Sequence, residues 1–87
     1  MQRQAPVYED IRRLALSLQG MTMPIPLLAP VLNLRGHRTT YGTPYAGGRG
    51  TYRLVKCAYY YTLQNYGEEE AELVKDSFTD LSGQHAF

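Results

Sequence analysis

The chain has 87 residues, of which 44% are hydrophobic and 20% are charged, and its formal net charge is +1. This length accommodates one domain with a modest core, and the composition is too apolar for a fully disordered chain. A single cysteine, Cys57, excludes a disulfide within the chain, and together with His37 and His85 it has no metal-ligand spacing. We therefore expect one domain over residues 1–87, with no structural metal and no cofactor.

The most apolar segment, residues 21–34, is too short to span a bilayer and contains three prolines. The first residues are polar and lack the apolar region of a signal peptide. A lone thiol fits a reducing compartment. We expect no membrane partner and a cytoplasmic location.

The first predicted helix begins at Pro6 and ends at Gly20. Proline suits the first helical position, and Glu9 and Asp10 follow near the positive end of the helix dipole. The apolar residues of this segment form one stripe, which consists of Val7, Ile11, Leu14 and Leu18.

The second predicted helix is short. Pro24 or Pro26 opens it, Gly36 marks its end, and Pro30 lies at the edge of the first turn or kinks the helix. The expected buried face consists of Leu27, Leu28, Val31 and Leu32.

Residues 36–50 form a predicted flexible, basic loop, with glycine at positions 36, 42, 47, 48 and 50. A loop of this length in a small domain is commonly functional or disordered. Residues 38–41 and 44–46 can pair as a hairpin through Gly42, which would give a short β-wing.

The third predicted helix is capped by Thr51 and ends before Gly67. A strand is the competing interpretation, but strict alternation of apolar and polar residues fails here. The expected core side consists of Leu54, Val55, Ala58, Tyr61 and Thr62. The opposite side consists of Arg53, Lys56, Cys57, Tyr60 and Gln64.

The fourth predicted helix covers residues 68–81, with acidic residues at its start, as the helix dipole favours. Its core stripe is expected to comprise Ala71, Val74, Phe78 and Leu81. Gly83 follows as a stop, and residues 84–87 form a C-terminal tail. The four elements predict a mainly α domain resembling a helix-turn-helix, although the loop between the second and third helices is far longer than in that motif.

Charge is separated along the chain. Residues 11–67 contain seven arginines or lysines and no acidic residue, and seven of the eight tyrosines lie in the same stretch. Basic side chains neutralise phosphates, and tyrosines donate to them or stack on bases. We therefore expect a nucleic-acid-binding protein with a regulatory or accessory role, and double-stranded DNA as the favoured ligand. The expected contact residues are Arg35, His37, Arg38, Arg49, Arg53, Lys56 and Tyr60.

Two alternatives stay open. The basic residues can be neutralised by the acidic fourth helix, either within the fold or across a dimer. Alternatively, the chain is a protein-binding inhibitor or adaptor whose interface includes Tyr59, Tyr60 and Glu69, because tyrosine and arginine dominate interface hot spots. Its size and charge layout are similar to those of small phage-encoded inhibitors such as anti-CRISPR proteins, although no motif supports this.

We expect a homodimer, because the tyrosine-rich third helix has more apolar surface than one chain can cover. We expect no enzymatic activity. The glycines are not followed by the Gly-Lys-Ser/Thr of a phosphate-binding loop, and the spacing of Cys57 from either histidine does not require a nucleophile–base pair.

Overall fold

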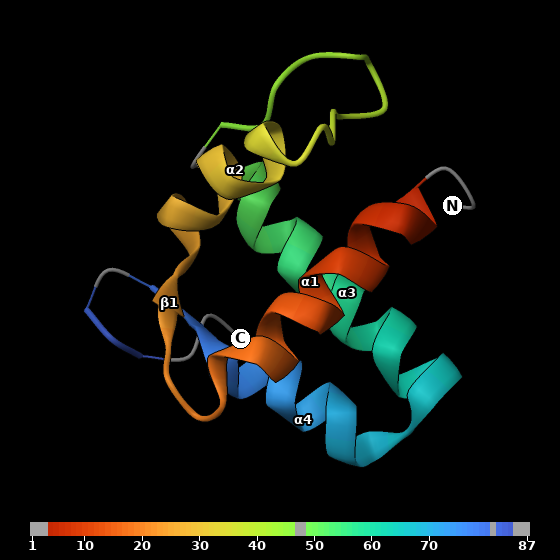
Figure 1. Ribbon diagram of the computed structural model, residues 1–87, viewed down its shortest axis with the longest axis vertical. Helices are drawn as coiled ribbons and strands as arrows, with labels where there is room; N and C mark the ends of the chain where they lie inside the picture. Colours follow the sequence, from red (N-terminus) through yellow and green to blue (C-terminus); the bar gives the residue numbers. More distant parts are fainter. Residues whose placement is uncertain (1–3, 47–48, 81, 85–87) are drawn as a thin grey trace.

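The computed structural model describes residues 4–46, 49–80 and 82–84. Four helices follow one another along the chain: α1 (Ala5–Leu18), α2 (Ile25–Leu34), α3 (Arg49–Tyr66) and α4 (Glu68–Ser77) (Figure 1). A short strand β1 (Met23–Pro24) precedes α2, and β2 (Phe78–Thr79) follows α4. The predicted small, mainly α, four-helix domain is confirmed.

Helix α3 is at the centre of the fold, since it contacts α1, α2 and α4. Each helix turns one stripe of small and branched apolar residues toward this centre, as their three- and four-residue spacing requires. The predicted buried face of α2 is confirmed at Leu28 and Leu32, whereas Leu27 is exposed. Ile25 and Ala29 complete the buried face in its place. The buried cluster consists of Val7, Ile11, Ala15, Ile25, Leu28, Leu32, Leu54, Val55, Ala58, Val74 and Phe78.

Helix α1 ends at Leu18, close to the predicted stop. It begins at Ala5, so Glu9 and Asp10 lie beyond its first turn, where the dipole has little effect on them. In α2, Pro30 lies inside the helix on its exposed side. The absent N–H of this proline leaves the carbonyl of Pro26, a half-buried residue, without its usual helical donor.

Helix α3 begins at Arg49, two residues before the predicted cap. Thr51 is buried in the first turn, and its hydroxyl donates to the carbonyl of Ala46. The prediction was wrong because this hydroxyl bonds backward to the preceding loop and does not cap a free N–H.

Helix α4 ends at Ser77 and not at residue 81. Phe78 and Thr79 leave the helix and pair in parallel with Met23 and Pro24. Phe78 is nonetheless fully buried, because it continues the helical spacing from Ala71 and Val74. A pair of two-residue strands is too short to show alternation in the sequence. Leu81 and residues 85–87 of the predicted tail lie outside the described residues.

The described part of the predicted loop contains no strand. It forms a tight turn, in which the Thr39 N–H donates to the Thr43 carbonyl at 2.9 Å and the Gly42 N–H donates to the Thr39 carbonyl at 2.9 Å. The hairpin expected through Gly42 is therefore reduced to this turn, and the two short strands of the fold lie elsewhere.

Candidate nucleic-acid interface

Arg12 is held inside the helical bundle by acidic residues. Its guanidinium contacts Glu9 at 3.0 Å and Glu70 at 2.7 Å, and it lies 3.9 Å from the centre of the Tyr66 ring. The hydroxyls of Tyr61 and Tyr66 donate to the same Glu9 carboxylate. One basic residue of the acid-free stretch is therefore neutralised within the fold and joins α1, α3 and α4.

Arg35 and His37 are both bound to Asp10. Asp10 is only 8% exposed, and it accepts from the Arg35 Nε at 2.6 Å and lies 2.8 Å from the His37 Nε2. The hydrogen bond from Arg35 holds the pKa of the Asp10 carboxyl below its ordinary value, against the opposing effect of burial. These two expected contact residues are thus committed to a carboxylate of α1, upstream of the basic stretch.

Arg38 is exposed and binds backbone rather than a carboxylate. Its guanidinium donates to the carbonyls of Asn33 and His37 at 3.1 and 2.7 Å. The Asn33 carbonyl belongs to the last turn of α2, where a cation is favourable. The arginine is therefore held in place, and none of the described acidic residues forms an ion pair with it.

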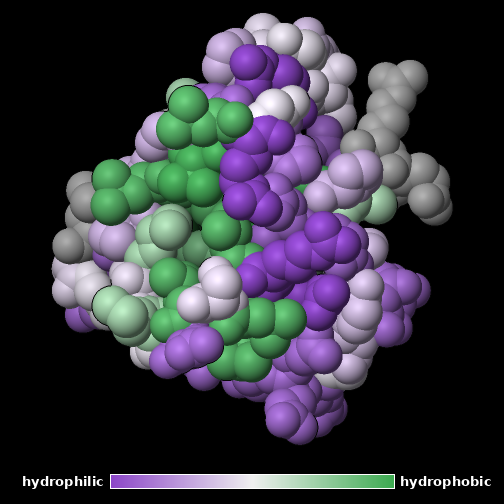
Figure 2. Space-filling view, in the orientation of Figure 1, coloured by the Kyte–Doolittle hydropathy of each residue, from purple (hydrophilic) through white to green (hydrophobic). Residues whose placement is uncertain are grey.

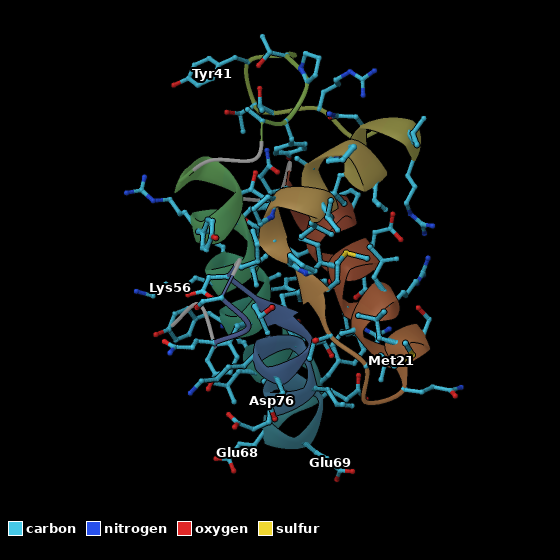
Figure 3. All side chains as sticks on the ribbon, turned by 90° about the vertical axis from the view of Figure 1, so that its left-hand side faces the viewer. Met21, Tyr41, Lys56, Glu68, Glu69 and Asp76 are labelled. Carbon is cyan, nitrogen blue, oxygen red and sulfur yellow. The ribbon has the colours of Figure 1, made fainter. Side chains whose placement is uncertain are left out.

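Arg53, Lys56 and Tyr60 lie on the exposed face of α3, as predicted. The two basic residues form no ion pair with any described residue, and Tyr60 is 54% exposed. Lys56 points away from the body of the molecule (Figure 3). Arg49 supplies the first residue of α3, but its side chain lies outside the described residues.

The sequence prediction missed Tyr41. This residue is 90% exposed and lies at the tip of the loop that follows α2 (Figure 3). The available signal was the three threonines around it, Thr39, Thr40 and Thr43, since threonine hydroxyls form local hydrogen bonds to the backbone.

A hollow of about 630 Å³ separates this loop from the first half of α3. Arg53, Gly50 and Leu54 line it from α3, and Tyr8 lines it from α1. The loop side is lined by Thr39, Thr40, Tyr41, Pro44, Tyr45 and Ala46. Cys57 also contacts the hollow and is half-buried, so it is neither a fully buried residue nor a freely exposed thiol.

The acidic side chains of α4 lie at the other end of the molecule. Glu68, Glu69 and Asp76 are at the end opposite Tyr41 (Figure 3). Tyr59 and Tyr60 also belong to the alternative protein interface. Their rings pack edge to face, with 5.1 Å between the ring centroids. Tyr59 also donates to Glu72 at 3.4 Å.

The exposed aliphatic side chains lie on α1, on α2 and on the connection between them, and not on the described part of α3. They gather around α2 and beside α1 (Figure 2). The exposed aliphatic residues are Leu16, Met21, Leu27 and Leu34. On α3, by contrast, Tyr59 and Tyr61 are partly covered within the chain. The reasoning that placed a dimer interface on α3 is therefore weakened, and the homodimer stays a prediction.

Among the described residues, no group of three His, Cys, Asp or Glu side chains could hold a metal ion. None of the described helices has the length and hydrophobicity that crossing a bilayer requires. Comparison with protein-family models, with curated proteins and with solved structures finds no match to this chain.

Proposed function

We propose that this protein binds duplex DNA through the exposed face of α3 and the adjoining loop, in a regulatory or accessory role. The observation that supports this most directly is the separation of uncompensated charge. Arg38, Arg53 and Lys56 form no ion pair with the described acids, and Glu68, Glu69 and Asp76 lie at the end of the molecule opposite Tyr41, with Lys56 between the two ends (Figure 3). This layout attracts a polyanion to one end and repels it from the other.

The dimensions of α3 suit a major groove. Its 18 residues give a length of about 27 Å, and a helix about 10–12 Å wide fits a groove about 12 Å wide. Arg53, Lys56 and Tyr60 recur at three- and four-residue spacing, so they line one edge of the helix. Arginine and lysine bind phosphates or guanine there, and Tyr60 and Gln64 reach further along the groove.

Helix α2 is the supporting element of this arrangement, because it contacts α3 and carries the loop. The connection between α2 and α3 covers residues 35–48, far longer than the three or four residues of a standard helix-turn-helix. We therefore describe the proposed mode as an atypical helix-turn-helix in which the extended connection adds its own contact surface.

The test is binding of a labelled duplex of two helical turns, measured by fluorescence anisotropy across about 50 to 200 mM salt. The variant Arg53→Glu, Lys56→Glu is compared with Arg13→Glu, Lys75→Glu, which changes the net charge equally at positions on α1 and α4. We expect the loss of duplex affinity to be at least tenfold greater in the α3 variant than in the control variant. Neutralising each phosphate contributes about 0.9 to the slope of log affinity against log salt, so that slope should fall by about two.

Equal losses in the two variants would show that net charge alone governs binding and would contradict the α3 site. Absence of binding by the unaltered protein at low salt would refute the proposed function.

A second candidate function is protein binding at the Tyr59–Tyr60 pair, where the half-exposed Tyr60 ring offers an aromatic anchor. In this case Tyr60→Ala and Glu69→Lys should abolish partner binding without affecting folding, and duplex binding should be absent.

A further inference from the structure

The turn that presents Tyr41 is closed by several hydrogen bonds. The Thr39 hydroxyl accepts from the N–H of Tyr41 at 3.3 Å and from that of Thr43 at 3.2 Å, and it lies 2.8 Å from the Thr43 hydroxyl. Gly42 has φ +80°, a conformation that glycine adopts without strain. An exposed aromatic residue is unremarkable by itself. Here, however, the hydrogen bonds of the turn hold the backbone of Tyr41 in place before any ligand binds.

The base of the loop is fastened to α2 and α1. The Asn33 side chain donates to the Tyr45 carbonyl at 2.9 Å and accepts from the Tyr45 N–H at 2.8 Å, as a neighbouring strand would. The Tyr45 hydroxyl donates to Gln4 at 3.0 Å, and His37 contacts Asp10. Residues 37–45 of the loop therefore have little conformational freedom left to lose when a ligand binds.

The hollow beside this loop combines an apolar lining with a cation. Pro44, Tyr45 and Leu54 supply apolar and aromatic surface, and Arg53 lies on its α3 side. Its volume of about 630 Å³ falls in the range of small-ligand sites, about 300–1,000 Å³. A flat aromatic group attached to a phosphate matches both the lining and the charge, and a nucleotide is such a group.

We propose that this hollow accommodates one unpaired nucleobase of a nucleic acid whose duplex part lies on α3, and that Tyr41 stacks on the unpaired strand at the rim. The proposal rests on the function proposed above. Bases within a duplex are already stacked and offer Tyr41 no free face, whereas an unpaired base gains from stacking on an aromatic side chain. The preferred ligand is therefore a duplex that adjoins an unpaired nucleotide.

The experiment compares a plain duplex with the same duplex carrying one unpaired 2-aminopurine, whose fluorescence is quenched when it stacks. We expect the unaltered protein to bind the second ligand about tenfold more tightly and to quench its fluorescence. Tyr41→Ala should remove both effects, so that this variant binds the two ligands with equal affinity. Tyr41→Phe should retain both, because the ring stays, and Leu34→Ala serves as a control at another highly exposed position.

A second variant tests the fixed geometry. Thr39→Val removes the hydroxyl that closes the turn, and it should lower the preference for the unpaired ligand several-fold while the circular dichroism spectrum stays unchanged. An equal affinity of the unaltered protein for the two ligands would overturn the inference and leave duplex binding intact. Loss of affinity for both ligands by the same factor in Tyr41→Ala would also overturn it, since Tyr41 would then be a general contact. Absence of binding to either ligand would refute both proposals together.

Discussion

Replacing Asp10 by Asn tests whether the basic residues nearest α1 stabilise the fold rather than bind ligand. The amide keeps the shape of the side chain, but it removes the charge that accepts from Arg35 and contacts His37. A hydrogen bond to a charged group contributes about 1.5–3 kcal/mol, and a pair with a solvent-exposed partner contributes about 0–1 kcal/mol. Because the Arg35 side chain is 45% exposed, we assign about 1 kcal/mol to its pair and about 1 kcal/mol to the His37 contact.

The expected loss is thus about 2 kcal/mol in the free energy of unfolding, or about 8–16 °C in Tm for a domain of this size. Urea denaturation followed by circular dichroism measures it, with Glu72→Gln as the control, because that exposed acid removes the same charge and should cost less than about 0.5 kcal/mol. Duplex affinity should not fall in Asp10→Asn, because this change removes no basic residue and frees the charge of Arg35. A loss of stability no larger than that of the control would refute the structural role of the cluster.

The Asp10 carboxylate should also make the free energy of unfolding depend on pH. Its pKa is lowered in the folded protein, chiefly by the hydrogen bond from Arg35, so the stability it supplies is present above the unfolded pKa of about 3.9. That stability is lost as pH falls through the folded pKa. The unaltered protein and Asp10→Asn should therefore differ less and less in their free energy of unfolding as the pH falls. A difference that does not depend on pH would contradict the stabilising role of the Asp10 carboxylate.

Two further substitutions test the fold. Gly67 has φ +99° between α3 and α4, and an added Cβ would meet no atom within 4 Å. Gly67→Ala should therefore lower the free energy of unfolding by about 1–3 kcal/mol through backbone strain alone. Gly50→Ala, within α3, should not lower it in a parallel denaturation experiment. Phe78→Ala should lose about 3–5 kcal/mol, because it empties a fully buried position, and a loss below about 1 kcal/mol would show that β2 does not contribute to the core.

The helices were predictable because their signals are local. The three- and four-residue recurrence of Leu54, Val55, Ala58 and Thr62 identified the buried side of α3, and the same recurrence placed Arg53 on the exposed side. The boundaries of α3 and α4 were less predictable. The backward bond of Thr51 and the pairing of Phe78 with Met23 both depend on residues that helical periodicity does not report.

The candidate site was predictable only in part, because ion pairing depends on distance in space. Arg53 and Lys56 lie where the sequence placed them, whereas Arg35 and His37 are bound to Asp10, 25 and 27 residues away along the chain. A sequence that lacks acids from residue 11 to residue 67 gives no indication that an upstream carboxylate will be buried against those side chains. Tyr41 was missed because its place at the tip of the turn depends on hydrogen bonds that the sequence does not reveal.

The parallel pairing of β1 and β2 connects the last described helix to the proposed DNA-binding end. Strand β1 runs directly into α2, and α2 contains Asn33, which holds Tyr45 and thereby the base of the loop. A chain extension, tag or partner that displaces residues 78–79 would consequently perturb the Tyr41 turn without touching it. Substitutions at residues 78–79 should therefore be read for their effect on this turn as well as on the core.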